Sequence, residues 1–239
     1  MSRPLEHITV LDLSRILAGP MCTQTLADLG ATVIKVEQPG VGDDTRQWGP
    51  PFVHGEDGQR VAAYFLSANR AKKSVTIDFS QNDGRDLVLE IAKKADVVVE
   101  NFKTGGLEKY GLHYKGIQQV NSSIIYCSIT GFGHSGPYKD RVGYDFMIQG
   151  MSGLMSITGE SDDSPGGGPV KVGVAVSDLF SGLYSVVGIL AALQHRDRTG
   201  EGQHIDISLF DSQVAVLANQ ALNYLTTGDA PQRLGNAHP

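Results

Sequence analysis

Short apolar runs alternate along the chain with longer segments in which apolar residues recur every three or four positions. Short runs rich in Val and Ile are typical of buried strands, and apolar residues at every third or fourth position are typical of amphipathic helices. Strands are predicted over residues 8–13, 31–37, 96–100, 123–130, 172–176 and 204–209. Helices are predicted over residues 20–29, 84–94, 145–156, 179–194 and 211–225, with a short one ending at 117–120.

The alternation of strands and helices predicts the fold class. Strands separated by helices build right-handed βαβ units, so we expect an α/β fold with a parallel sheet and helices on both faces. Such sheets bind ligands at the carboxyl ends of their strands. The positions of interest are therefore those that follow the predicted strands: 14–19, 37–40, 101–106, 131–136 and Asp178.

Two Gly/Pro-rich stretches interrupt this alternation. Residues 38–60 hold the only tryptophan, Trp48, and residues 159–168 are polar. Loops of that length within a compact domain tend to be functional or mobile.

The composition narrows the classes of function. The chain has 239 residues and a formal net charge of −6, with no basic stripe, so nucleic acid is not an expected partner. The N-terminus does not resemble a signal peptide, and the longest apolar stretch, near residues 186–193, is too short for a membrane span. We therefore expect a soluble, cytoplasmic protein with no membrane partner. Cys22 and Cys127 lie in apolar segments and are expected to be buried free thiols.

One carboxylate lies in an otherwise apolar run. Asp178 falls where the predicted strand 172–176 meets the predicted helix 179–194. Unpaired N–H groups and the helix dipole favour the ionised form of an acid at such a junction. A carboxylate kept ionised beside apolar walls can act as a nucleophile. The alternative is that Asp178 only caps the helix, because Asp is among the preferred N-cap residues.

Several common motifs are absent from the sequence. Glu37 ends the second predicted strand, where a dinucleotide-binding domain places its ribose-binding acid, but the first βα turn reads SRILAGPMCTQ and lacks G-x-G-x-x-G. No P-loop, G-x-S-x-G or H-E-x-x-H occurs, so these phosphate, seryl-hydrolase and metal sites have no support. His134, in the segment GFGHSGP, either approaches a ligand or is a solvated loop residue.

Six segments, in order along the chain, resemble those of one family. They read LEHITVLDLSRILAGPMCTQTLADLGATVIKVEQPGVGDDTR, SANRAKKSVTIDF, DVVVENFKTGGLEKYGL, IIYCSITGFGHSGPY, VGYDFMIQGMSGLMSITG and VGVAVSDLFSGLYSVVGILAAL. Together they closely resemble the class III CoA-transferase family, which includes formyl-CoA and carnitine CoA-transferases and the α-methylacyl-CoA racemases. The similarity runs nearly end to end and is nearest to members that act on dicarboxylic acids.

The resemblance implies a Rossmann-like large domain of an interlocked homodimer, with acyl-CoA and carboxylic acid substrates. Coenzyme A is then a substrate and carrier, and no metal is implied. The catalytic aspartate of the family matches Asp178. Contacts with CoA or substrate are implied for residues on several loops: Ile16, Leu17, Ala18, Gln38, Asn101, Phe102 and Tyr144. Lys72 and Lys73 either meet the nucleotide phosphates or form a solvated basic pair. Gln38 replaces an arginine that formyl-CoA transferases place near adenine, which removes a guanidinium available for stacking.

Tyr144 favours CoA transfer over racemisation. The racemases of the family carry a histidine in a GHD segment, and the matching segment here is Gly143-Tyr144-Asp145. A tyrosine side chain, with an unperturbed pKa of about 10, replaces that base poorly near neutral pH. We therefore expect transfer through an aspartyl anhydride and an aspartyl-CoA thioester. An α-methylacyl-CoA racemase or epimerase and an inactive CoA-binding domain remain as alternatives.

Chains of the resembled family are considerably longer than this one. The resemblance implies that residues 1–228 form the N-terminal part of the large domain and that residues 229–239 begin a linker to a small domain. On this interpretation the chain is a fragment, or a second polypeptide completes its active site. The missing segments would leave apolar surface exposed and favour association.

Overall fold

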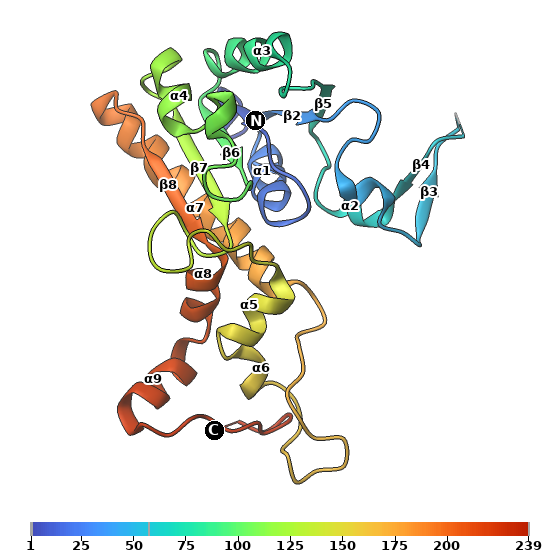
Figure 1. The fold of residues 1–239 in the computed structure, drawn as a ribbon, viewed down its shortest axis with the longest axis vertical. Coiled ribbons are helices and arrows are strands. Elements are labelled where there is room, and N and C mark those ends of the chain that lie inside the picture. Colours follow the sequence, from blue (N-terminus) through green and yellow to red (C-terminus); the bar gives the residue numbers. More distant parts are fainter. Residues whose placement is uncertain (1, 57, 239) are drawn as a thin grey trace.

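The computed structural model describes residues 2–56 and 58–238, and its central element within that part of the chain is a six-stranded parallel sheet. The strand order is β5-β2-β1-β6-β7-β8. The strands are β1 Thr9–Asp12, β2 Thr32–Glu37, β5 Lys73–Thr76, β6 Val97–Glu100, β7 Ile125–Thr130 and β8 His204–Ser208. A short antiparallel hairpin, formed by β3 Phe52–His54 and β4 Arg60–Ala62, projects beside this sheet (Figure 1).

Helices cover both faces of the sheet, as the alternation of strands and helices along the chain predicts. The helices are α1 Ala18–Asp28, α2 Ala63–Ser67, α3 Asn82–Ala92, α4 Tyr114–Val120, α5 Asp145–Met151, α6 Leu154–Ile157, α7 Val176–Thr199, α8 Leu209–Val216 and α9 Ala218–Thr227. Val10 points into a core with α1 and α7, and Leu11 points into a second core with α3 and α4. The predicted Rossmann-like α/β fold is confirmed. Both cysteines are buried free thiols, as predicted.

The prediction of a strand over residues 172–176 is wrong. This segment has irregular backbone, and α7 already begins at Val176. Residues 172–176 pair with neither edge strand of the sheet, β5 or β8. Their side chains are not in the core, and Val174 is 57% exposed. An apolar run becomes a strand only where the fold places it beside another strand.

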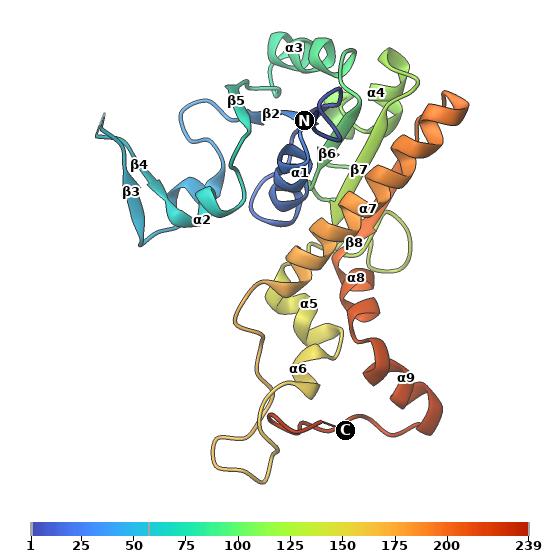
Figure 2. The same cartoon turned by 180° about the vertical axis from the view of Figure 1, so that it is seen from behind.

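Two predicted helices are each divided. The helix expected over 145–156 is split into α5 and α6 by Gly153, which has a φ of +92°. The helix expected over 211–225 begins earlier, at Leu209, and divides at Leu217 into α8 and α9. Figures 1 and 2 show α5, α6, α8 and α9 extending away from the sheet, with the C-terminus at their far end.

The long helix α7 has two different faces. One face packs against α1, β7 and β8 and buries small and apolar residues such as Ser181, Ile189 and Leu193. The opposite face exposes a stripe of large apolar side chains: Phe180, Leu183, Tyr184, Val187 and Leu190. By length and composition alone α7 could cross a membrane, contrary to the sequence expectation, although the core helix of a soluble protein meets the same criterion.

Candidate active site

The first turn of α7 carries Asp178, but Asp178 does not cap the helix. The N-cap residue is Ala175, whose side chain accepts no hydrogen bond from the first turn. The N–H of Ser177 instead donates to Oδ1 of Asp145, from α5, at 2.8 Å. Asp145 therefore satisfies an end group of α7 from a different helix, and the interpretation of Asp178 as an N-cap is wrong.

Burial dominates the electrostatics of Asp178. Burial, with a smaller contribution from the negative charge of Asp145, raises the pKa of this carboxyl from 3.8 to about 7. The sequence predicted the opposite direction, from the helix dipole. That prediction is wrong because, within residues 2–56 and 58–238, no hydrogen-bond donor reaches the Asp178 oxygens to favour their ionised form. Near neutral pH the side chain is thus divided between its protonated and ionised forms.

Asp178 opens into a cavity of about 300 Å³ at the carboxyl ends of β1, β6 and β7. This is the edge at which parallel sheets bind ligands. Of the residues predicted to contact CoA or substrate, several line the same cavity: Ile16, Ala18, Asn101, Phe102 and Tyr144. Leu17 is buried at the start of α1 and does not line it. Arg15, Lys103 and Arg141 add cationic groups to the wall that the sequence did not single out.

The turn before α1 is fixed to the segment after β6. The N–H of Arg15 donates to Oδ1 of Asn101 at 2.8 Å, and Nδ2 of Asn101 donates to the carbonyl of Arg15 at 2.6 Å. The carboxylate of Glu100 accepts the N–H of Phe102 at 2.8 Å. Two loops that are distant in sequence therefore form one wall of the cavity.

The opposite wall depends on a close approach of two glycines. A Cβ added to Gly131 would lie 2.6 Å from the backbone N of Gly143, and one added to Gly143 would lie 2.8 Å from Cα of Gly131. Only residues without a side chain allow these backbones to touch. The contact places Tyr144 and Asp145, which directly follow Gly143, at the end of β7.

Tyr64, in α2, also belongs to this region and was missed by sequence reasoning. The pKa of Tyr64 is raised by burial and then by the negative charges of Asp178 and Asp145. Its ring makes an edge contact with Trp48, at 5.3 Å between centroids. The loop that follows β2 therefore reaches the neighbourhood of Asp178, which no motif in the sequence indicated.

A second cavity, of about 400 Å³, adjoins the first along Arg15, Phe102 and Lys103. Gln38 lines it, together with the rings of Phe79 and Tyr110 and the ammonium group of Lys109. Aromatic faces beside cationic side chains suit a nucleotide, since the rings can stack on a base and the cations can pair with phosphates.

The structure corrects the phosphate prediction for Lys72. Its Nζ donates to Oδ2 of Asp12 at 3.1 Å, to the carbonyl of Pro20 at 2.9 Å and to Oδ1 of Asn69 at 2.9 Å. The side chain is only 2% exposed, so all three donors serve protein acceptors. Lys73 lies exposed at the start of edge strand β5, and its phosphate contact stays a prediction.

His134 lies away from Asp178. Its backbone N–H donates to Asp206 at 2.8 Å, and its ring lines a third cavity together with His113 and His204. The ring atom Nε2 is buried without a hydrogen-bond partner among the described residues. Whether His134 contacts a ligand or is a solvated loop residue therefore stays open.

The comparisons with known proteins agree on one family. Residues 5–239 match the model of CoA-transferase family III. The chain is 58% identical to succinate–glutarate CoA-transferase of Agrobacterium fabrum, over 99% of this chain and 58% of that protein. It is 48% identical to human succinyl-CoA:glutarate CoA-transferase, over 99% of this chain and 52% of that protein.

Among solved structures, a CAIB/BAIF family protein from Brucella suis superposes with a TM-score of 0.95 and 59% identity, covering all of this chain and 62% of that one. The chain belongs to CoA-transferase family III. The family resemblance stated from the sequence is thereby confirmed. This family III chain spans between about half and three-fifths of the length of the relatives described above.

Proposed function

We propose that the protein containing this chain transfers CoA from an acyl-CoA to a dicarboxylic acid, with Asp178 as the nucleophile. The observation that carries the proposal is the Asp178 carboxylate at the end of a cavity that continues into a second, nucleotide-sized one. The adjoining cavities together suit an acyl group and the CoA to which it is attached. The names of the two curated relatives described above supply the substrate class, with succinyl-CoA as donor and glutarate as acceptor.

The reaction proceeds by exchange at the Asp178 carboxylate. One oxygen attacks the thioester carbonyl, and CoA leaves as a thiolate, so an acyl-aspartyl anhydride forms. The thiolate then attacks the aspartyl carbonyl, releasing the first acid and leaving an aspartyl-CoA thioester. The acceptor carboxylate attacks that thioester, and the same steps in reverse deliver acceptor-CoA and free Asp178. A raised pKa makes the ionised Asp178 more basic than an ordinary aspartate, and such a carboxylate is also a better nucleophile.

The cationic wall suits a substrate with two carboxylates. Arg15 and Arg141 line the Asp178 cavity, and Lys103 lies where this cavity meets the second one. The guanidinium of Arg15 forms an ion pair with Asp44 at 2.8 Å. The guanidinium carbon of Arg141 instead lies 4.3 Å from the centroid of the Tyr138 ring. Arg141 therefore remains able to form a bidentate pair with the distal carboxylate of succinate or glutarate.

The exposed face of α7 supports a homodimer. Phe180, Leu183 and Val187 belong to a continuous apolar stripe on this helix. Such a stripe is unusual on the surface of a monomer and typical of an association surface. A second copy of the protein is the partner that we propose for it.

The experiment that tests the function is an assay of the full-length protein with succinyl-CoA and a panel of mono- and dicarboxylic acids. Formation of glutaryl-CoA with release of succinate is expected, and addition of hydroxylamine during turnover should convert Asp178 to a hydroxamate detectable by peptide mass. An active enzyme with an unmodified Asp178 would contradict the covalent route. Deuterium entering the α-carbon of an α-methylacyl-CoA without any acceptor acid would favour a racemase.

The pH dependence of the first chemical step provides a further prediction. Because only the ionised form of Asp178 attacks, the rate of acyl transfer to the protein should rise with pH and reach half its maximum near pH 7. Asp145→Asn removes a negative charge and retains an oxygen for the Ser177 N–H, so the midpoint should move to lower pH. Burial remains the larger cause, and we expect a shift of less than about one unit. Single-turnover rates between pH 5 and 9 measure it, and an unchanged midpoint would contradict this role of Asp145.

A further inference from the structure

Ile16, on the wall of the Asp178 cavity, has an unusual backbone conformation. Its φ is +71°, a left-handed value that crowds the Cβ of any L-residue and is least favourable for a β-branched one. The other non-glycine residues with positive φ in the described part of the chain are Ala71 and Ala218, neither of which is β-branched. Such a conformation persists only where the surroundings fix it, and it is often found at functional sites.

The group that fixes it is a buried carboxylate from the loop after β2. Both oxygens of Asp43 lie 3.3 Å from the backbone N of Ile16. Oδ1 of Asp43 also accepts the N–H and the hydroxyl of Thr45, at 3.0 and 2.7 Å. The Asp43 side chain is fully buried, so these contacts are not in competition with water.

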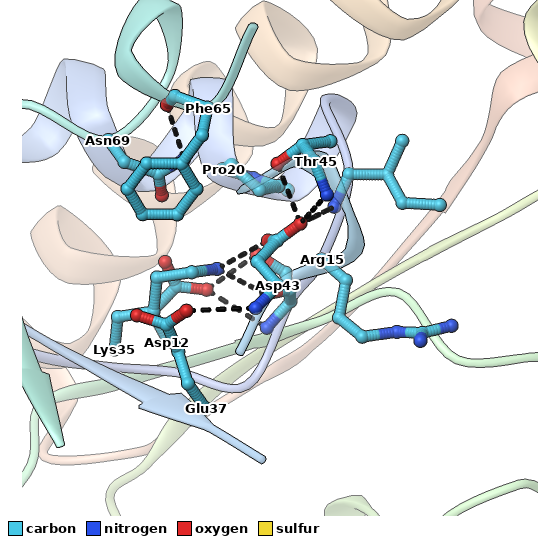
Figure 3. Close-up of polar contacts among 12 residues, drawn as sticks. Asp12, Arg15, Pro20, Lys35, Glu37, Asp43, Thr45, Phe65 and Asn69 are labelled. Carbon is cyan, nitrogen blue, oxygen red and sulfur yellow. Dashed lines mark hydrogen bonds and ion pairs between the residues drawn. The ribbon is translucent and has the colours of Figure 1, made fainter. Parts of the chain in front are cut away.

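Lys35, on β2, joins this carboxylate to the other side of the same turn. Its Nζ pairs with Oδ2 of Asp43 at 3.0 Å and donates to the carbonyl of Ser14 at 2.7 Å. The Lys35 side chain is 1% exposed. One buried ion pair therefore binds the backbone on both sides of Arg15, at Ser14 and at Ile16. Figure 3 shows the side chains of Lys35 and Asp43 directed toward each other.

The remaining polar groups of the turn are held as well. Asp12 accepts the N–H and the hydroxyl of Ser14, and Asn101 bonds both the N–H and the carbonyl of Arg15. Among these contacts, the pair of hydrogen bonds from Ile16 to Asp43 acts directly on the strained residue. Losing it would free Ile16 to return to a negative φ, which would turn its side chain within the cavity wall.

We propose that Asp43 is a positioning residue for CoA transfer, which holds Ile16 in its left-handed conformation so that the turn 14–17 presents a fixed wall beside Asp178. The inference rests on the proposed function, because the wall matters only if acyl transfer occurs at Asp178. It assigns Asp43 a role in the geometry of the reaction in addition to its place on the wall of the second cavity.

The test compares Asp43→Ala with Asp96→Ala in the full-length protein. Alanine is used because asparagine would keep an oxygen that can accept the Ile16 N–H. Asp96 is the control, because it also accepts a backbone N–H, from Thr9 at 2.8 Å, and pairs with an arginine, but at the opposite end of the sheet. Asp43→Ala should lower kcat by about 10-fold or more with a smaller change in KM for acyl-CoA, since misplacement of a positioning wall lowers the rate of the bound state. Asp96→Ala should lower the unfolding temperature without changing kcat.

A second variant separates positioning from general loss of stability. Glycine adopts positive φ without steric cost, so Ile16→Gly needs the Asp43 contact less. In the Ile16→Gly background, Asp43→Ala should change kcat by less than about 3-fold, compared with about 10-fold in the natural sequence. Equal losses in both backgrounds would show that Asp43 acts by another route and would overturn the proposal.

A crystal structure of Asp43→Ala reports on the proposal whether or not CoA is transferred. The φ of residue Ile16 should become negative in this variant, and a φ still near +71° would overturn the proposal. If instead the natural protein transfers no CoA, the proposed function fails. If the natural protein is active and Asp43→Ala has a normal kcat, only the positioning role fails.

Discussion

Asp178→Asn is expected to abolish CoA transfer by the full-length protein. An amide cannot form the anhydride, and the nearest replacement acid, Asp145, is engaged by Ser177 at 2.8 Å and by Gln149 at 2.7 Å. Loss of a covalent nucleophile typically lowers kcat by about 10³-fold or more. Succinyl-CoA consumption measures this, with Asp197→Asn, an exposed acid on the same helix, as the control. A variant that retains more than a tenth of the natural kcat would show that Asp178 is not the nucleophile.

The same substitution should stabilise the folded protein at alkaline pH. The folded-state pKa of Asp178 is raised to about 7, above its unfolded value near 4, so folding favours the protonated form. Ionisation therefore costs stability progressively as the pH rises from about 4 to about 7. Asparagine does not ionise, and we expect Asp178→Asn to gain about 2 kcal/mol in unfolding free energy at pH 8 after allowance for partial exposure, and little at pH 4. Denaturant titrations at both pH values test this, and an equal gain at pH 4 would contradict it.

The fold was predictable where local pattern and tertiary environment agree. Val10 and Leu11 alternate between two cores, and the buried run after Asp96 has a strand on each side, so the periodicity of these segments matches their surroundings. Strand β5 was missed because its sequence, Lys73–Thr76, is short and mostly polar, and it forms by pairing with β2 at the sheet edge. The run 172–176 has the pattern of a strand, but the fold does not pair it with either edge of the sheet.

The site was predictable only in part, since the family resemblance pointed to Asp178 but its ionisation depends on packing. The sequence shows a helix start, whereas only the folded chain shows that burial and Asp145 oppose ionisation there. The same limit explains Lys72, which reads as a surface cation yet pairs with Asp12 inside the molecule. Asp43 carries no motif either, because its partners, Ile16 and Lys35, are brought to it only by the fold.

Gly182→Ala should impair both the fold and the reaction, because α1 and α7 touch at this residue. Gly182 lies one turn after Asp178, and an added Cβ would come within 2.8 Å of the carbonyl oxygen of Ala18 and 3.3 Å of Cβ of Met21. The Ala18 oxygen belongs to the backbone of α1 and cannot move aside as a flexible side chain could. The added Cβ therefore forces α1 and α7 apart. Ala18 also lines the Asp178 cavity, and the separation therefore moves the wall relative to the nucleophile.

We expect Gly182→Ala to cost about 1–3 kcal/mol of stability through overpacking. We also expect kcat/KM to fall by about 10-fold or more, since small misplacements near a reacting group are costly. Gly188→Ala is the matched control in the same helix: its Cβ would approach only the side chain of Ile205, at 3.1 Å. Both substitutions gain the same helix propensity, about 1 kcal/mol, so their difference isolates the contact with α1. Thermal unfolding and steady-state kinetics of the two variants measure that difference, and equal behaviour would mean that the approach of α1 to α7 does not set the geometry at Asp178.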